Sequence, residues 1–302
     1  MFRDGIGDSS EFAGYHPWVN LIFYILVIGL TMFSLSTWFL AVTFTMSWLY
    51  SVLLKGKDAI KINMFFTLWV LVIMALVNTF FVHDGVTPLF YINGNAITLE
   101  AFIYGLSAGI MLISVLIWFV SFNVIMSADK LIFIFGKATP VLGLTLSMIF
   151  RYIPLLQERF SEIHTGQACL GRNEQKGMMS RFRNFAKESS ILVSWSLESS
   201  IESADSMEAR GYGLKGRTAF HLYKFTFRDK FLLIVFIFLG TIAATGRVMG
   251  GGSVLFYPEY KIEALGISGM ISLIAYISLL AIPIIIDFLS ELKWRNTESE
   301  LL

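Results

Sequence analysis

The sequence predicts an all-α polytopic membrane protein with about six transmembrane helices and a cytoplasmic insert of amphipathic helices. Hydrophobic residues make up 56% of the 302 residues and charged residues 15%. A soluble domain of this length needs less apolar surface, whereas a chain embedded in lipid needs this much. The charge is also unevenly distributed, since 13 of the 23 Lys and Arg residues lie in a polar stretch from Arg151 to Lys230. Long apolar runs flank that stretch on both sides.

The runs before the polar stretch predict four spans. Residues 18–54 carry no charge over 37 positions, nearly twice the ~20 residues that cross a hydrocarbon core of ~30 Å. Two helices joined near residues 34–37 are therefore expected. The third and fourth uncharged runs are residues 62–82 and 101–128. Because lipid offers no partner for backbone polar groups, these segments are expected to be helices.

Two further spans are expected after the polar stretch, at residues 231–246 and 264–286. The first has 16 residues, short for a span, and the second has 23. The chain then divides into three regions. An N-terminal membrane region covers residues 1–128, a cytoplasmic region of amphipathic helices covers 129–230, and a C-terminal membrane region covers 231–302.

The basic residues predict the orientation. Lys55, Lys57 and Lys61 lie between the second and third spans, whereas residues 83–100 contain no Lys or Arg. By the positive-inside rule, the first of these loops and the polar stretch face the cytoplasm. Six spans then place both termini inside, and the protein is expected to be a multi-pass protein of the cell (plasma) membrane.

The first helix of the insert is predicted from an apolar stripe whose members recur at spacings of four and three residues. The stripe consists of Ile149, Ile153, Leu156, Phe160 and Ile163. Pro154 interrupts the helix and is expected to kink it, or to mark where a span turns along the membrane surface. A face this apolar is expected to contact a membrane partner or the protein's own spans.

The second helix is expected from about Phe185 to Arg210, with two rows of side chains. A modest apolar row consists of Val193, Leu197, Ile201 and Ala204, and a row of small residues consists of Ser189, Ser196, Ser199, Ser203 and Ser206. Small residues allow helices to approach closely. Gly211 and Gly213 are expected to end the helix, which leaves Arg210 at a helix C-terminus, free to reach an acidic partner.

No catalytic, metal or cofactor site is expected. The sequence has no phosphate-binding loop of the Gly-x-x-x-x-Gly-Lys-Ser/Thr type, so the chain is not itself an ATPase. The four histidines lack ligand spacing, and the single cysteine, Cys169, excludes an internal disulfide. Two alternative functions remain. One is a membrane-embedded enzyme that uses Asp205, Glu208 and Arg210, and the other is a permease that forms its own pathway.

A family resemblance enters at the end of the second helix. Residues 203–213, with Ala209-Arg210-Gly211 among them, closely resemble the signature of the transmembrane T component of energy-coupling factor transporters. That family includes the membrane subunit of the cobalt importers. Residues 148–156 resemble the family's Arg-aromatic-Ile-Pro-Leu segment, and His16-Pro17 fits the start of its first span.

The resemblance implies roles for the ends of both helices. In the family, two Ala-Arg-Gly motifs end two coupling helices, and each Arg docks into a groove of one ATP-binding cassette subunit. Ala209, Arg210 and Gly211 match the second motif, whereas Cys169, Leu170 and Gly171 stand where the first would be. Either Arg172 replaces the missing charge, although two residues turn a helix by about 200°, or Leu170 enters an apolar pocket.

The resemblance also implies the partners. They are two ATP-binding cassette ATPases, a small membrane protein that binds the substrate, and the lipid bilayer, with no nucleic acid and no cofactor. The chain would be a non-catalytic scaffold that transmits ATPase motion for uptake of a vitamin or a metal ion. The stripe from Ile149 to Ile163 would then contact the substrate-binding subunit or pack beneath it.

Overall fold

The computed structural model describes residues 10–33, 35–92, 95–138, 140–171, 177–212, 214, 223–249, 254–258, 260–262 and 265–301. These residues form nine α-helices, one short 3₁₀ helix and two small hairpins. The chain divides into two compact units, one of residues 1–127 with 223–302 and one of residues 128–222. The all-α class predicted from the composition is confirmed.

The first unit holds the apolar helices. Its helices are α1 (Pro17–Met32), α2 (Thr37–Lys55), α3 (Lys57–Phe81), α4 (Leu99–Ile125), α8 (Phe227–Met249) and α9 (Ile267–Leu301). Five of them, α2, α3, α4, α8 and α9, are long and apolar enough to cross a membrane, and α1 is a shorter apolar helix. The break between α1 and α2 lies where the sequence predicts it. Helix α8 is longer than its predicted 16 residues at both ends. It begins at Phe227, before the charged residues 228–230, and continues through Arg247 to Met249.

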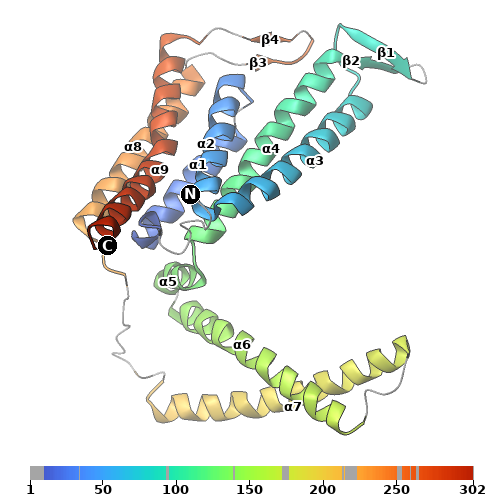
Figure 1. Ribbon diagram of the computed structural model, residues 1–302, viewed down its shortest axis with the longest axis vertical. Helices are drawn as coiled ribbons and strands as arrows, with labels where there is room; N and C mark the ends of the chain where they lie inside the picture. The colour runs from blue at the N-terminus through green and yellow to red at the C-terminus, as the bar shows by residue number, and fades with distance from the viewer. Residues whose placement is uncertain are drawn as a thin grey trace. The chain divides into compact units, whose positions relative to one another are not determined.

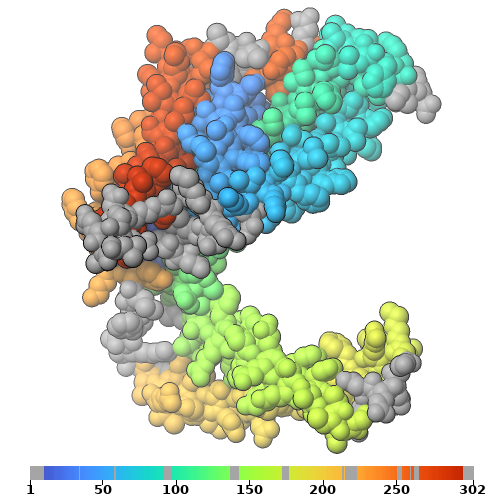
Figure 2. Space-filling model, viewed as in Figure 1, coloured from blue at the N-terminus to red at the C-terminus, as the bar shows by residue number. Residues whose placement is uncertain are grey.

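Neighbouring helices pack side by side in this unit (Figure 1). Helix α3 packs along α4, α8 packs along α9, and α1 and α2 contact both of these pairs. The α3–α4 contact is close, since a Cβ atom at Gly105 would lie only 2.9 Å from the carbonyl oxygen of Met74. Figure 2 shows α3 along the outside of the unit, where most of its large apolar side chains are exposed. Exposed apolar helix faces are typical of contact with lipid.

Two antiparallel hairpins lie at one end of the helices (Figure 1). One pairs β1 (Pro88–Ile92) with β2 (Asn95–Thr98), and the other pairs β3 (Val254–Leu255) with β4 (Lys261–Ile262). These strands are not predictable from the sequence, because they are short and lack a sustained alternation of apolar and polar residues.

The core of this unit is aromatic. Trp118 of α4 is fully buried, and its ring centroid lies 5.9 Å from that of Phe23 and 5.8 Å from that of Tyr50. The indole N–H of Trp118 donates a hydrogen bond to Thr43 at 3.3 Å. Thr43 in turn bonds Thr31 at 3.2 Å. Burying large aromatic rings stabilises the fold through packing. The threonine hydroxyls supply the hydrogen bond that the buried indole N–H would otherwise make with water.

A buried carboxylate holds the N-terminal segment against this bundle. Asp287 of α9 is fully buried and accepts hydrogen bonds from the Ser10 hydroxyl at 2.9 Å, the Phe12 amide at 2.9 Å and the Tyr50 hydroxyl at 3.1 Å. Phe12 belongs to the 3₁₀ helix η2 (Phe12–Gly14). The sequence predicts that the last span ends at Ile286, one residue before Asp287, but α9 continues past this carboxylate because its hydrogen-bond donors satisfy it.

At the start of α1, His16 is the N-cap, and its Nδ1 accepts a hydrogen bond from the Trp18 amide at 3.3 Å. The His16 amide donates to Asp229 of α8 at 3.2 Å. Pro17 occupies the first helical position, where a missing N–H costs nothing. The His16-Pro17 pair therefore has a local structural role in starting α1.

The second unit contains α5 (Ala128–Ala138), α6 (Pro140–Cys169) and α7 (Met178–Ala209). Helix α7 begins seven residues before the predicted Phe185, because residues 178–184 join the helix although they belong to neither predicted row. Helix α6 is continuous through Pro154, so the proline does not end it.

We expect Asp287→Ala to destabilise the membrane unit, because it leaves three buried donors without their acceptor. Each unsatisfied buried group costs about 1–3 kcal/mol. Thermal unfolding in a neutral detergent should show a clear fall in the midpoint. Asp205→Ala, at an exposed position of α7, is the matched control and should change the midpoint little. Equal midpoints for the two variants would contradict a structural role for the carboxylate.

Candidate partner-docking surface

The second unit is built on the crossing of α6 and α7, which run in opposite directions (Figure 1). At one side of the crossing, the Tyr152 hydroxyl hydrogen-bonds Ser203 at 2.9 Å. At the other side, the rings of Phe160 and Phe185 meet edge to face with centroids 6.1 Å apart. Between them, the Arg159 guanidinium lies over the Trp195 ring at 5.3 Å. The C-terminal ends of the two helices therefore point away from each other.

The serine row of α7 supplies the contact with α6. Ser189, Ser196, Ser199 and Ser203 are half-buried, whereas Ser206 is exposed. Ser203 also donates to the Ser199 carbonyl at 2.7 Å, so its hydroxyl is satisfied within the helix. The hydrogen bond with Ser203 lowers the pKa of the Tyr152 hydroxyl, and a smaller contribution in the same direction comes from Ser199. Small side chains allow the close approach, as the row predicts.

The apolar row of α7 has the opposite placement. Val193 is 58% exposed, Leu197 63% and Ile201 65%, and Ala204 is exposed as well. A soluble helix pair would bury such a row against its neighbour. Here α7 places its serines inside and its aliphatic side chains outside, so this face fits a partner or a lipid surface.

The predicted α6 stripe is divided between two environments. Ile149 and Ile153 are exposed, whereas Leu156, Phe160 and Ile163 are half-buried. Phe160 contacts Phe185 and stacks on His164, with ring centroids 6.5 Å apart in the stacked pair. The C-terminal half of the stripe thus packs within the helix pair, and the N-terminal half stays open.

Helix α7 ends in a Schellman motif. Gly211 has φ +80°, its amide donates to Glu208 at 2.9 Å, and the Tyr212 amide donates to Met207 at 3.0 Å. In this motif Gly takes the left-handed position that a Cβ atom disfavours. Ala209 is the last helical residue and Arg210 the exposed C-cap. The helix dipole favours a cation there.

Helix α6 ends in a similar way. Gly171 has φ +72°, and its amide donates to Ala168 at 3.0 Å. Cys169 is the last helical residue, and Leu170, in the place that Arg210 has on α7, is 68% exposed. Arg172 lies outside the described residues. The residue before the left-handed glycine is therefore an exposed leucine on α6 and an exposed arginine on α7.

A groove of about 460 Å³ lies between the N-terminal half of α6 and the C-terminal half of α7. Its charged lining residues are Arg151, Glu202 and Arg210. Among the described residues, Arg210 takes part in no ion pair. Arg151 lies off the apolar stripe of α6 in the sequence. That it lines the same groove as Arg210 depends on how the helices cross, which a single sequence does not give.

A further contact, between His164 and Glu188, lies at the other side of the crossing and is not predicted from the sequence. Glu188 is buried in α7, and its carboxylate lies 3.1 Å from Nδ1 of His164 on α6. The sequence does contain a signal for it, since Glu188 lies on the α6-facing side with Ser189 and Ser196. No group of three or more His, Cys, Asp or Glu residues suited to a metal ion occurs among the residues that the structure describes.

No family model matches this chain. A curated relative is the energy-coupling factor transporter transmembrane protein EcfT of Bacillus selenitireducens, 32% identical over 115 residues. The aligned region covers 37% of this chain and 43% of the relative, so the chain matches less than half of the relative's length. This partial similarity supports the resemblance to T components that the motifs indicate.

The helix ends give a prediction with matched controls. Gly211→Ala should fray the end of α7, because Ala at φ +80° is strained and its Cβ would lie 3.0 Å from Leu214. We expect a cost of about 1 kcal/mol, measured as faster hydrogen exchange at the amides of residues 210–212. Gly171→Ala, with open space around the Cβ atom, should show the backbone strain alone, at the end of α6.

Gly166 lies inside α6, also with open space around it, so Gly166→Ala should slow exchange, since Ala favours helix by about 1 kcal/mol. Unchanged exchange in Gly211→Ala would contradict the left-handed cap.

Proposed function

We propose that this chain is the transmembrane scaffold subunit of an energy-coupling factor importer of the ATP-binding cassette type. In this role it is not an enzyme. It transmits the motion of ATPase subunits to a membrane protein that binds a vitamin or a metal ion. The observation that carries the proposal is the Arg210 end of α7, a cation without an ion pair among the described residues, held at a capped helix terminus. The similarity to EcfT supports it.

Arg210 is suited to dock an ATPase subunit. A guanidinium offers five N–H donors in a planar fork that matches a carboxylate, and the Schellman cap fixes the backbone from which it projects. Arg151 lines the same groove and adds a second cation. An acidic site on an ATPase would be complementary to this end, with Ala209 and Gly211 allowing a close approach.

The end of α6 is proposed to receive the second ATPase. Its backbone resembles that of α7 up to the glycine, but Leu170 replaces the arginine at the C-cap. Leu170 would then enter an apolar pocket, or Arg172 would supply the charge. Cys169 and Gly171 would contact the partner beside it. Because α6 and α7 end on opposite sides of their crossing (Figure 1), two ATPases would have separate positions.

The exposed aliphatic side chains are proposed to contact the substrate-binding subunit. Ile149 and Ile153 lie on α6, and Val193, Leu197 and Ile201 lie on α7. Movement of the helix ends by the ATPases would shift this surface directly, since rigid helices connect the two. Leu156, Phe160 and Ile163 would support the surface from within the helix pair. The second unit would lie in the cytoplasm, and the partner would determine the substrate.

We expect Arg210→Glu to uncouple the transporter. Truncating one partner of a desolvated charge pair costs about 2–5 kcal/mol, and reversal adds repulsion. Affinity purification of the chain from its own cells should recover much less ATPase with this variant, and uptake should fall. Arg183→Glu, a reversal at the exposed opposite end of α7, is the control and should retain both. Normal recovery and normal uptake with Arg210→Glu would refute the docking role.

Two substitutions on the α6 stripe should separate partner contact from internal packing. Ile153→Asp is expected to release the substrate-binding subunit while the ATPases still co-purify, because the side chain is exposed. Phe160→Asp should instead loosen the α6–α7 pair and reduce the recovery of every partner, because it places a charge where the half-buried ring of Phe160 packs on Phe185.

Gln157→Asp, on the exposed polar side of α6, is the control for the added charge. Retention of all partners with both Ile153→Asp and Phe160→Asp would contradict the assignment of the stripe.

A further inference from the structure

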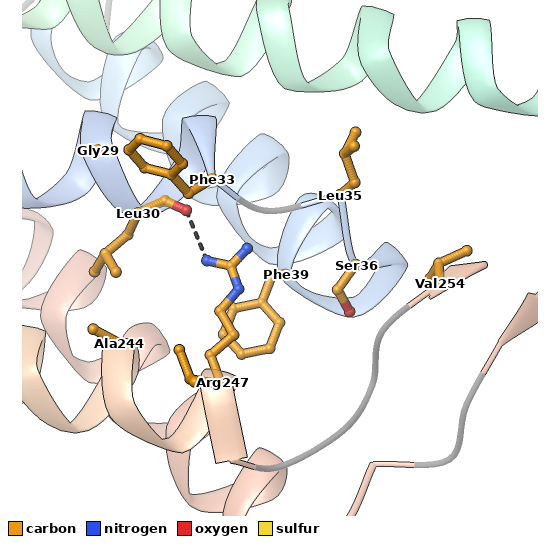
Figure 3. A pocket seen from close by; sticks show the side chains of 10 residues that line it. Gly29, Leu30, Phe33, Leu35, Ser36, Phe39, Ala244, Arg247 and Val254 are labelled. Carbon is orange, nitrogen blue, oxygen red and sulfur yellow. Dashed lines mark hydrogen bonds between the residues drawn. The ribbon is translucent and has the colours of Figure 1, made fainter. Parts of the chain in front are cut away.

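The membrane unit contains a pocket of about 580 Å³ where α1 ends and α2 begins (Figure 3). The last turn of α8 and Val254 of β3 complete it. Most of its lining is apolar and includes Leu30, Phe33 and Phe39. All three helices are apolar and are expected to lie in lipid, so the pocket opens at the membrane surface.

Arg247 is the cation of this pocket. Its Nη1 donates to the Leu30 carbonyl at 2.8 Å, and its guanidinium lies over the Phe39 ring at 5.0 Å. A guanidinium has five N–H donors, and this is its one hydrogen bond within the described part of the chain. No ion pair of Arg247 occurs among these residues. The positive charge therefore lacks a counter-charge in an apolar setting, which is costly without a ligand.

Ser36 provides an independent indication of a ligand. It is 8% exposed and lines the pocket, and its Oγ is buried without a hydrogen-bond partner. Buried hydroxyls are nearly always paired. Ser36 is also the N-cap of α2, yet its side chain makes no cap hydrogen bond. The first amides of α2 and the positive end of its dipole thus remain available to an anion beside Ser36.

We propose that this pocket binds the phosphate group of an anionic phospholipid. The guanidinium, the Ser36 hydroxyl and the start of α2 would together hold the phosphate, whose oxygens accept charge-assisted hydrogen bonds from such donors. Phe33 and Val248 line the pocket and are each more than 80% exposed, and they suit acyl chains rather than water. The lipid leaflet is therefore the source that the surroundings favour over free phosphate.

A purely structural role for Arg247 explains less. Its hydrogen bond to Leu30 caps one of the last carbonyls of α1, as cations near helix C-termini often do. That role uses one donor and leaves the buried Ser36 hydroxyl unexplained. A phosphate accounts for both residues and for the open start of α2.

Lipid binding to the full-length chain tests the proposal. The protein is purified in a neutral detergent with its co-purifying partners, and bound lipid is measured by native mass spectrometry after addition of phosphatidylglycerol or phosphatidylcholine. Phosphatidylglycerol should bind the wild type about tenfold more tightly, and Arg247→Gln should lose about tenfold of that affinity. Arg228→Gln, in the first turn of the same helix, is the matched control and should bind normally. Millimolar inorganic phosphate should not displace the lipid.

The proposal is overturned if Arg247→Gln retains phosphatidylglycerol, if both lipids bind equally, or if Arg228→Gln loses as much affinity. Displacement by inorganic phosphate would show that free phosphate, and not a lipid, is the ligand. Should Arg247→Gln fail to fold, Ser36→Ala decides, because Ser36 makes no hydrogen bond through its side chain. This variant must weaken phosphatidylglycerol binding severalfold for the proposal to stand. None of these outcomes depends on docking of ATPases at Arg210.

Discussion

The proposed function depends on how α6 and α7 cross. Their contact uses a tyrosine–serine hydrogen bond on one side and an aromatic pair on the other, and the serine row allows the helices to approach. Because serine and aromatic side chains form that contact, the aliphatic row of α7 lies outside it and is exposed. The crossing also separates the two C-termini, so that each glycine-capped end is presented alone. One packing contact thus produces both the open apolar face and the two helix ends.

In the membrane unit, most of the buried polar groups described above have hydrogen-bond partners within the unit. Asp287 accepts from Ser10, Phe12 and Tyr50, and Trp118 reaches a threonine. These groups join segments that are far apart in the sequence, where apolar contact alone gives little specificity because lipid is equally apolar. Arg247 and Ser36 depart from this pattern, since their polar groups are incompletely satisfied among the described residues. Their unused hydrogen-bonding capacity is what supports a ligand in the pocket that they line.

Much of the fold follows from the sequence because long uncharged runs and the row of small residues are local signals. The break near residues 34–37, the apolar helices and the capped end at Gly211 are of this kind. The placement of Arg151 beside the Arg210 groove, the division of the Ile149–Ile163 stripe and the Asp287 cluster depend on which helix faces meet. A pattern along one chain identifies a face but not its partner, so the sequence predicted an apolar stripe on α6 without dividing it between packing and exposure.

Photo-crosslinking from the end of α7 tests the central claim most directly. A photoreactive amino acid replaces Tyr212, which is exposed and lies two residues after Arg210, in the full-length chain within its own cells. We predict that it captures a nucleotide-binding ATPase, and that the same group at Thr241, exposed on α8, does not. Mass spectrometry of the crosslinked product identifies the partner. Capture of no ATPase from position 212, in cells where the chain is folded and in the membrane, would contradict the account.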